Sequence, residues 1–462
     1  MLTYDLDRRG KLARYDYLYR CMKEDILSGR LKAGEKLPSK RSLAAHLETA
    51  VVTVENAYAQ LAAEGYIHTR EKRGCFVAQV EQRPEGSPPP AVPVPRPESA
   101  PWLLDLSSGG SGTEGFPFSV WAKVMRRVIT EQGETLLRAI PHNGAEELRR
   151  AISRHLYQYR GISAGPEQIV VGAGTEYLCN LIVQLLGRQA RYGVEDPGYS
   201  KAARVYELNG AEAVPLAMDG EGVPPAELEA AGVQIVHLSP NHQFPTGAVT
   251  PIGRRQSLLR WAEAGERRYI IEDDYDSEFR FTGRPIPALR SIDRADRVIY
   301  MNTFSRTLAP SLRISYLVLP KALLGEYQAR LGFYSCTVPA MEQYTLARFL
   351  EDGHFDAHVN RMRNFYRSRR DRVLEAIRRS PLGPRCRVSG ENAGLHFLLT
   401  LSTQKSDREL AAAAEAQRLR LSFLSDFQCR PGTAQPHTLV VNYPGVALVE
   451  LDRALALLAK LL

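Results

Sequence analysis

The stretch that decides the fold of this chain is Asn302-Thr303-Phe304-Ser305-Arg306-Thr307-Leu308-Ala309-Pro310-Ser311-Leu312-Arg313. It lies between two apolar runs, Val298–Asn302 and Ile314–Leu319, which have the length and composition of buried strands. The stretch itself is rich in hydroxyl side chains and contains two arginines, Arg306 and Arg313. The sequence therefore predicts a polar connection between two strands of a buried sheet.

Apolar runs alternate with amphipathic segments along most of the chain after residue 102. The predicted strands are Gln168–Val171, Tyr192–Glu195, Gln234–Ser239, Tyr269–Glu272, Val298–Asn302 and Ile314–Leu319. Predicted helices lie between many of them, among them Glu146–Tyr159, Glu176–Gly187 and Arg254–Ala264. This alternation predicts an α/β fold in which helices cover a mostly parallel sheet. We assign residues 102–352 to this large domain. Residues 353–462, which start with a long basic helix at Phe355–Arg379, are expected to form a smaller α+β subdomain.

The first 80 residues follow a different plan. Helices are predicted at residues 11–28, Lys40–Leu47 and Val52–Glu64, with short strands at Tyr66–His68 and Cys75–Val77. Three helices followed by a hairpin predict a winged helix-turn-helix domain over residues 1–80. This region holds 14 Lys and Arg against 10 Asp and Glu, a net charge of +4 out of +8 for the chain. A compact basic segment favours a polyanionic partner.

A proline-rich segment separates these two regions. Residues 83–101 contain eight prolines, so the segment cannot join a central strand or continue a helix, and it favours an extended conformation. At roughly 3.1 Å per residue it would reach up to about 60 Å. We therefore predict that residues 81–101 form a semi-rigid linker.

The composition excludes several other classes of protein. A chain of 462 residues with 44% hydrophobic residues is expected to form two or three globular domains. It contains no run of 18 apolar residues, and its first ten residues are polar, which argues against a membrane span or a secretory signal. Its six cysteines are far apart and show no metal-ligand spacing. We expect a cytoplasmic protein with reduced thiols and no metal site.

Four segments of the N-terminal region carry a family resemblance. They are Gly34–Ala44, Thr53–Tyr58, Leu61–Ile67 and Arg73–Val77. In this order they resemble the GntR family of winged-helix repressors, and the resemblance covers nearly all of residues 12–78. It implies binding to double-stranded DNA. The residues that we assign to DNA contacts are Ser39, Lys40, Arg41, Thr53, Arg70, Lys72 and Arg73.

The chemistry of the second predicted helix agrees with this resemblance. Pro38 and Ser39 begin the helix, so its free backbone N–H groups and the Arg41 guanidinium can face a phosphate. One departure concerns the third helix, where the family usually has a Ser-Arg pair and this chain has Ala50-Val51-Val52. A phosphate or base contact is then missing there, or an apolar contact to a thymine methyl group replaces it.

Residues 105–460 resemble a second family, the fold-type I aminotransferases, in the version that the MocR subfamily of GntR regulators fuses to its DNA-binding head. The matching segments are Phe116–Trp121, Gly144–Arg149, Gly172–Glu176, Glu195–Tyr199, His242–Gly247, Glu272–Arg280 and Asn302–Arg313. The resemblance implies a homodimer and the cofactor pyridoxal 5'-phosphate. The residues that it assigns to this cofactor are Gly174, Thr175, Tyr199, Asp273, Tyr275, Thr303, Arg306 and Arg313.

Five of these residues are assigned to the phosphate group. Gly174 and Thr175 lie between a predicted strand and a helix, where free N–H groups and the helix dipole favour an anion. The resemblance places Thr303, Arg306 and Arg313 near the same phosphate. Two guanidinium groups are suited to a dianion because each presents a planar fork of donors.

The other three residues are assigned to the pyridine ring. Tyr199 is expected to stack on the ring, and Tyr275 to donate to its phenolic oxygen. Asp273 is expected to keep the ring nitrogen protonated, the state in which the cofactor withdraws electrons. Glu272, Asp273 and Asp274 could instead bind a metal, but no histidine lies nearby in the sequence, and we expect none.

The resemblance fails at the position that matters most for catalysis. Arg306 stands where the aminotransferases carry the lysine that binds the cofactor covalently. A guanidinium stays protonated and delocalises its lone pair, so it forms no imine and cannot act as the catalytic base. Val440 also stands where these enzymes often have an arginine for the substrate carboxylate. We therefore expect no catalytic residue in this body.

These features predict a DNA-binding transcriptional regulator whose aminotransferase-like body dimerises and senses an effector without a covalent bond. The effector would be pyridoxal phosphate or a related small molecule, including an amino acid or amine acting with it. Two alternatives remain: an active aminotransferase with a DNA-binding head, and a DNA-binding scaffold whose body has lost its ligand. The retained Asp273 and Tyr275 argue against the last, because a decayed pocket is expected to lose them.

Overall fold

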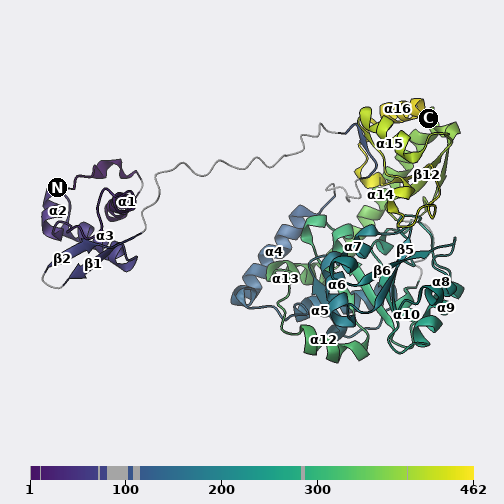
Figure 1. Ribbon diagram of the computed structural model, residues 1–462, viewed down its shortest axis with the longest axis horizontal. Helices are drawn as coiled ribbons and strands as arrows, with labels where there is room; N and C mark the ends of the chain where they lie inside the picture. Colours follow the sequence, from purple (N-terminus) through teal and green to yellow (C-terminus); the bar gives the residue numbers. More distant parts are fainter. Residues whose placement is uncertain are drawn as a thin grey trace. The chain divides into compact units, whose positions relative to one another are not determined.

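The computed structural model describes residues 2–10, 12–70, 73–80, 102–107, 115–281, 287–392 and 394–462. The chain forms two compact units, Met1–Glu98 and Ser99–Leu462, each described by itself below (Figure 1). The predicted linker at residues 81–101 and the predicted DNA contact Lys72 lie outside the described residues.

The N-terminal unit contains a helical core followed by a hairpin (Figure 1). Its elements are η1 (Leu6–Arg9), α1 (Arg14–Leu27), α2 (Lys40–His46), α3 (Val51–Ala63), β1 (Ile67–Arg70) and β2 (Gly74–Val77). Leu18, Met22 and Leu61 are fully buried between the helices. The two strands are antiparallel, with Ile67 opposite Val77. All the predicted helices and strands of the winged helix-turn-helix are present, within a few residues of their predicted bounds.

The C-terminal unit is built on a seven-stranded sheet in the order β4-β10-β9-β8-β7-β5-β6. The strands are β4 (Ile169–Gly172), β5 (Arg191–Asp196), β6 (Glu212–Ala217), β7 (Ile235–Leu238), β8 (Tyr269–Asp273), β9 (Val298–Thr303) and β10 (Ser315–Val318). Only β10 runs against its neighbours, so the predicted mostly parallel sheet is confirmed. Strand β6 was not among the predicted strands. It contains Pro215 and lies at the edge, where a missing N–H is tolerated.

Helices cover both faces of this sheet. The first face packs against α6 (Thr175–Leu186), α7 (Ser200–Leu208) and α12 (Leu324–Leu331). The second packs against α4 (Phe118–Gln132), α5 (Glu146–Arg160), α8 (Pro225–Ala231), α9 (Ile252–Glu263) and α13 (Ala340–Glu351). The strands are mostly apolar because both faces of the sheet are covered: neighbouring residues such as Ile235 and Val236 point to opposite faces, and each face packs against helices. The short helices α10 (Leu289–Ile292) and α11 (Phe304–Thr307) flank β9.

A smaller subdomain gathers at one end of this unit, where α15, α16 and β12 are labelled in Figure 1. The long helix α14 (His354–Arg379) leads into it from the large domain. Its other elements are β11 (Cys386–Ser389), β12 (Phe397–Leu401), α15 (Asp407–Ala416), β13 (Leu419–Arg420), β14 (Thr438–Val441), α16 (Leu451–Leu461) and the early strand β3 (Leu104–Asp105), which pairs with β13. No helix in the described part of the chain combines the length and apolar character that a membrane span requires.

Candidate cofactor site and nucleic-acid interface

The carboxyl ends of the parallel strands meet at one edge of the sheet. The segments that follow β4, β5, β7, β8 and β9 converge there, because β10 is antiparallel to both of its neighbours and the other strands share one direction. Ligands of open α/β sheets bind at this edge. One cavity at this edge is lined by Thr175, Tyr199, Ser239, Phe244, Asp273, Tyr275, Thr303 and Arg306.

The structure brings six of the eight predicted cofactor residues to this cavity, while Gly174 and Arg313 are not among its lining residues. The cavity has a volume of about 70 Å³. Pockets that enclose a whole small ligand usually measure roughly 300–1,000 Å³. A ligand as large as pyridoxal phosphate would therefore need this cavity to widen.

Asp273 presents one carboxylate oxygen to this cavity. Its Oδ2 lies 3.4 Å from Nε2 of His237, and Nδ1 of His237 lies 2.7 Å from the Tyr206 hydroxyl. Burial alone would lower the pKa of His237, but the hydrogen bond to Asp273 raises it to about 10. The imidazolium therefore faces the Asp273 carboxylate as its charged partner. Oδ1 of Asp273 is enclosed and has no hydrogen-bond partner among the described residues.

Aromatic side chains form the walls beside Asp273. The rings of Tyr199 and Phe244 are 6.4 Å apart and nearly perpendicular, and so are those of Phe244 and Tyr275. Burial raises the pKa of Tyr199 to about 12, so its hydroxyl stays protonated at neutral pH. The Tyr275 hydroxyl lies 3.2 Å from Nδ1 of His242. This arrangement suits a flat ring with polar groups at its edge.

Hydroxyl and amide groups surround the other end of the cavity. Helix α6 begins at Thr175 after Gly174, whose φ of +96° favours glycine. The Thr303 hydroxyl accepts from the Ser305 amide at 3.1 Å. Thr175, Thr303 and Arg306 therefore place hydroxyl and guanidinium groups at this end of the cavity.

Arg313 lies beside this end but is held by an acidic residue. Its Nη2 lies 3.0 Å from Oε2 of Glu176 and 3.4 Å from the carbonyl oxygen of Ala173. The guanidinium covers Gly174, where an added Cβ would lie 2.3 Å from the same nitrogen. The side chains of Arg313 and Glu176 are 52% and 35% exposed, so the pair is at the surface. The Arg313 guanidinium, which was predicted to bind a phosphate, is therefore already paired with Glu176.

Of the three acidic residues at the end of β8, only Asp273 lines the cavity, while Glu272 and Asp274 share the amide of Asn241. Glu272 accepts hydrogen bonds from the backbone amides of Leu289 and Arg290, at 2.7 and 2.8 Å. Asp274 forms a buried ion pair with Arg160, at 2.7 Å, on the opposite side of the chain from the cavity residue Asp273. Among the described residues, no group of three or more His, Cys, Asp or Glu side chains is arranged to hold a metal ion.

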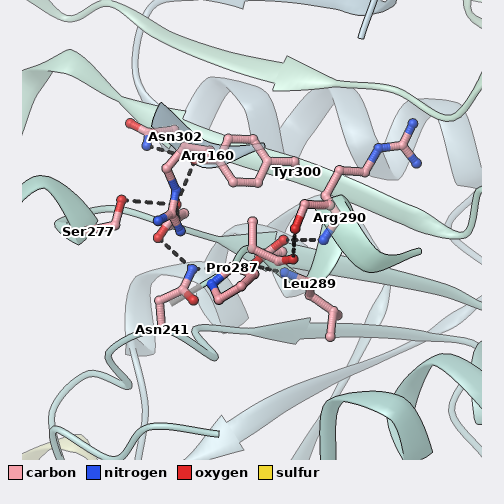
Figure 2. A network of polar contacts seen from close by, with 12 residues as sticks. Arg160, Asn241, Ser277, Pro287, Leu289, Arg290, Tyr300 and Asn302 are labelled. Atoms are coloured by element: carbon pink, nitrogen blue, oxygen red, sulfur yellow. Dashed lines mark hydrogen bonds and ion pairs between the residues drawn. The ribbon is translucent and has the colours of Figure 1, made fainter. Parts of the chain in front are cut away.

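A buried polar network surrounds Asp274. Its carboxylate accepts from the Tyr300 hydroxyl at 2.7 Å, from Nδ2 of Asn241 at 2.7 Å and from the Ser277 hydroxyl at 3.0 Å, in addition to the Arg160 pair (Figure 2). Asp274 is 1% exposed and Arg160 is 8% exposed. This network fixes the turn from which the Asp273 and Tyr275 side chains reach the cavity.

The predicted DNA-contacting residues lie on the surface of the N-terminal unit. Ser39 caps α2 by accepting from the Ser42 amide at 3.1 Å, and Arg41 is exposed in the first turn. Lys40 pairs with Glu55 of α3 at 2.6 Å, so it is already partnered. Thr53 is half-buried near the start of α3.

The hairpin adds two exposed cations. The Arg70 guanidinium lies over the Phe76 ring, 5.0 Å from its centre, and Arg73 is exposed at the turn. Val51 and Val52, at the start of α3, are 43% and 58% exposed. Exposed valines at the start of a helix that is predicted to enter the major groove are compatible with apolar contacts to bases.

Comparisons with known proteins agree with this division of the chain. The family model "Bacterial regulatory proteins, gntR family" matches residues 14–77, and "Aminotransferase class I and II" matches residues 103–457. The HTH-type transcriptional regulator YdeL of Bacillus subtilis (strain 168) is 39% identical over 96% of both chains. The probable rhizopine catabolism regulatory protein MocR of Rhizobium meliloti is 31% identical, over 91% of this chain and 88% of its own. The chain belongs to the MocR-type GntR regulators.

Two further comparisons bear on this MocR-type regulator. PdxR of Corynebacterium glutamicum, named as an HTH-type pyridoxine biosynthesis transcriptional regulator, is 33% identical over 81% of this chain and 80% of its own. Among solved structures, a multiple substrate aminotransferase from Thermococcus profundus superimposes with a TM-score of 0.70 and 25% identity, over 79% of this chain and 92% of its own. The fold-type I aminotransferase fold of the body is thus confirmed.

Sequence reasoning missed four residues at the cavity of this MocR-type regulator. Ser239 and Phe244 line it, His237 holds Asp273, and Glu176 holds Arg313. A signal existed for three of them: Phe244 and Glu176 belong to motifs that match the family, and His237 is a polar residue inside an otherwise apolar strand. The Glu176–Arg313 pair joins residues 137 positions apart, which no local pattern reveals.

Proposed function

We propose that this MocR-type regulator binds DNA as a homodimer and that its body reversibly binds pyridoxal phosphate or a close phosphorylated relative. The GntR-type head implies DNA binding, and occupancy of the body would alter it. One relative is named for regulating pyridoxine biosynthesis, which supports a ligand of this class. Because Arg306 replaces the lysine of aminotransferases, the ligand would be held by non-covalent contacts alone.

The observation that carries this proposal is the unpaired Oδ1 of Asp273. A buried carboxylate oxygen without a partner is costly, and a protonated pyridine nitrogen would satisfy it. His237 already holds the other oxygen. Phe244 and Tyr199 would enclose the ring, and Thr175, Thr303 and Arg306 would donate to the phosphate. Bound pyridoxal phosphate supplies an electron-withdrawing ring and an aldehyde.

The proposal is tested by titrating the full chain with pyridoxal phosphate and following its absorption spectrum. Saturable binding at one site per chain, fully reversed by dialysis, is the expected result. If the spectrum of pyridoxal phosphate does not change even at millimolar ligand, the chain has no such site. The body would then be a scaffold that does not bind this ligand. Pyridoxal, which lacks the phosphate, should bind more weakly.

Salt dependence of DNA binding is a first expected result. An operator selected from genomic fragments with the full chain should bind less tightly as salt rises, because bound phosphates release counterions. Substitution Arg41→Ala should weaken binding to every sequence and reduce the slope of log K against log salt by about 1. Fluorescence anisotropy measures both quantities, and sedimentation should give two chains per operator.

The control for this measurement is Arg20→Ala, which removes an exposed arginine of α1 that pairs with Asp16. It should leave the affinity and the salt slope unchanged. Selection that enriches no sequence, or an equal loss in both variants, would contradict the assignment of Arg41 to a phosphate contact.

Removal of the Glu176 carboxylate should strengthen binding of pyridoxal phosphate. Glu176→Gln frees Arg313 for the phosphate, and exposed ion pairs contribute about 0.2–1 kcal/mol, so we expect up to about a five-fold lower Kd. The affinity for pyridoxal should not change, because it has no phosphate. The control Glu131→Gln removes an exposed carboxylate that pairs with Arg127. A gain of equal size for both ligands would show that Arg313 is not involved.

A further inference from the structure

A second cavity lies in the body, where the end of α5, the turn after β8 and the start of α14 meet. Its volume is about 260 Å³, and it shares no lining residue with the cavity at the strand ends. Its charged lining residues include Arg160, Glu278, Asp356 and Arg363. None of the four belongs to the residues that the aminotransferase resemblance assigned to a cofactor.

The two guanidinium groups at this cavity are engaged by the protein. Arg160 pairs with Asp274 inside the buried network (Figure 2). Arg363 donates through Nε and Nη2 to the carbonyl oxygen of Glu278, at 3.1 and 2.9 Å, and through Nη1 to Asn360. Both cations therefore serve the structure of the wall, and Tyr159 is hydrogen-bonded to the Asp356 carboxyl group. Glu278 is therefore the carboxyl group left to face a ligand.

Glu278 supplies an acceptor of this kind. Its Oε2 is enclosed and has no hydrogen-bond partner among the described residues. Burial, with the nearby Asp274 carboxylate, raises the pKa of Glu278 to about 7, so a cation that binds beside it would favour its ionised form. Asp356, in the first turn of α14, adds a second carboxyl group to the lining.

The rest of the cavity wall is aromatic and aliphatic. The His155 ring lies 5.1 Å from the Phe355 ring, nearly perpendicular to it, and 4.8 Å from the Tyr159 ring. Burial lowers the pKa of His155 to about 4, so this ring is neutral near pH 7. Val359 completes the apolar part. Aromatic faces attract cations, and an apolar wall accepts the hydrocarbon part of the same molecule.

We propose that this cavity is a second ligand site, which binds a small organic primary amine. The ammonium group donates to Oε2 of Glu278 and lies against the aromatic wall, and the hydrocarbon part contacts Phe355 and Val359. The site is independent of pyridoxal phosphate binding. It adjoins the Arg160–Asp274 pair and the helix α14, which leads into the small subdomain, so an amine here contacts both parts of the body.

The test is calorimetric titration of the full chain, without any pyridoxal compound, with n-butylamine and benzylamine. Butyrate and benzoate have matching shapes and the opposite charge. The amines should bind at one site per chain and the carboxylates should not. Glu278→Gln should weaken amine binding at least about ten-fold, because a charge-assisted hydrogen bond contributes roughly 1.5–3 kcal/mol.

Two further variants separate the site from general effects. Glu375→Gln removes an exposed carboxylate of α14 that pairs with Arg378. This variant should leave amine binding unchanged. Val359→Phe fills the cavity but retains Glu278, and should abolish binding even if Glu278→Gln proves poorly folded. The proposal is overturned if neither amine binds, if the carboxylates bind as well as the amines, or if a folded Glu278→Gln or Val359→Phe variant binds amines like the parent chain.

Discussion

The substitution Arg306→Lys should convert reversible pyridoxal phosphate binding into covalent attachment. Dialysis should clear the ligand from the parent chain, and borohydride should leave no adduct. The variant should retain one ligand per chain after dialysis, and borohydride should fix that ligand to the introduced lysine. The reason is that a lysine amine can lose its proton and attack an aldehyde, which a guanidinium cannot do. Mass spectrometry of the reduced peptide measures the difference, which is all or none.

The matched control is Arg306→Gln, which removes the positive charge without adding a nucleophile. It should lower the affinity for pyridoxal phosphate and yield no adduct. Stoichiometric covalent labelling of the parent chain at a single cavity lysine would refute the non-covalent proposal. A folded Arg306→Lys variant that takes up no ligand would show that the cavity, of about 70 Å³, does not open for one.

The second large effect concerns the stability of the body. Arg160→Ala leaves Asp274 in the buried network without its cation, and breaking a buried pair in this way costs about 3–5 kcal/mol. The hydroxyl and amide donors to Asp274 remain, but they do not neutralise its charge. Urea unfolding followed by tryptophan fluorescence isolates the body, because all three tryptophans (Trp102, Trp121 and Trp261) lie after residue 101.

Arg150→Ala is the matched control for this measurement. Arg150 lies on the same helix and forms an exposed ion pair with Glu146, one turn away. Such pairs contribute about 0.3–0.5 kcal/mol. A loss below about 1 kcal/mol in Arg160→Ala would mean that Asp274 takes up a proton at little cost. In that case, adding Asp274→Asn to Arg160→Ala should restore none of the lost stability. We expect instead that the double variant regains part of the free energy of unfolding that Arg160→Ala loses.

The sequence predicted the site well where topology alone brings residues together. Thr175, Tyr199, Asp273, Tyr275 and Arg306 follow four different strands, and parallel strands end at one edge of a sheet. The strand pattern predicted a common edge of the sheet, and the family resemblance selected these residues along it. The same logic recovered the winged helix-turn-helix, whose helix and strand boundaries are set by local capping and turn signals.

Pairing between distant side chains was beyond sequence reasoning. Arg313 was assigned to a phosphate and is held by Glu176, and Lys40 was assigned to DNA and pairs with Glu55. The packing of separate elements decides which carboxylate lies next to a long, flexible Lys or Arg side chain. An exposed ion pair contributes little free energy, so one carboxylate partner can replace another at small cost. Residue types thus predicted the sign of the charge at each place but not its partner.

The hairpin between β9 and β10 has a consequence for the history of this chain. Thr303 pairs with Ser315 across the two strands, and Phe304 and Leu308 anchor the connection in the core. Residue 306 lies in the connection and is not one of the paired residues of the two strands. Lysine and arginine codons of the AAR and AGR type differ by one base. A lineage can therefore lose or regain covalent capture of a cofactor through one nucleotide change, while the same architecture persists.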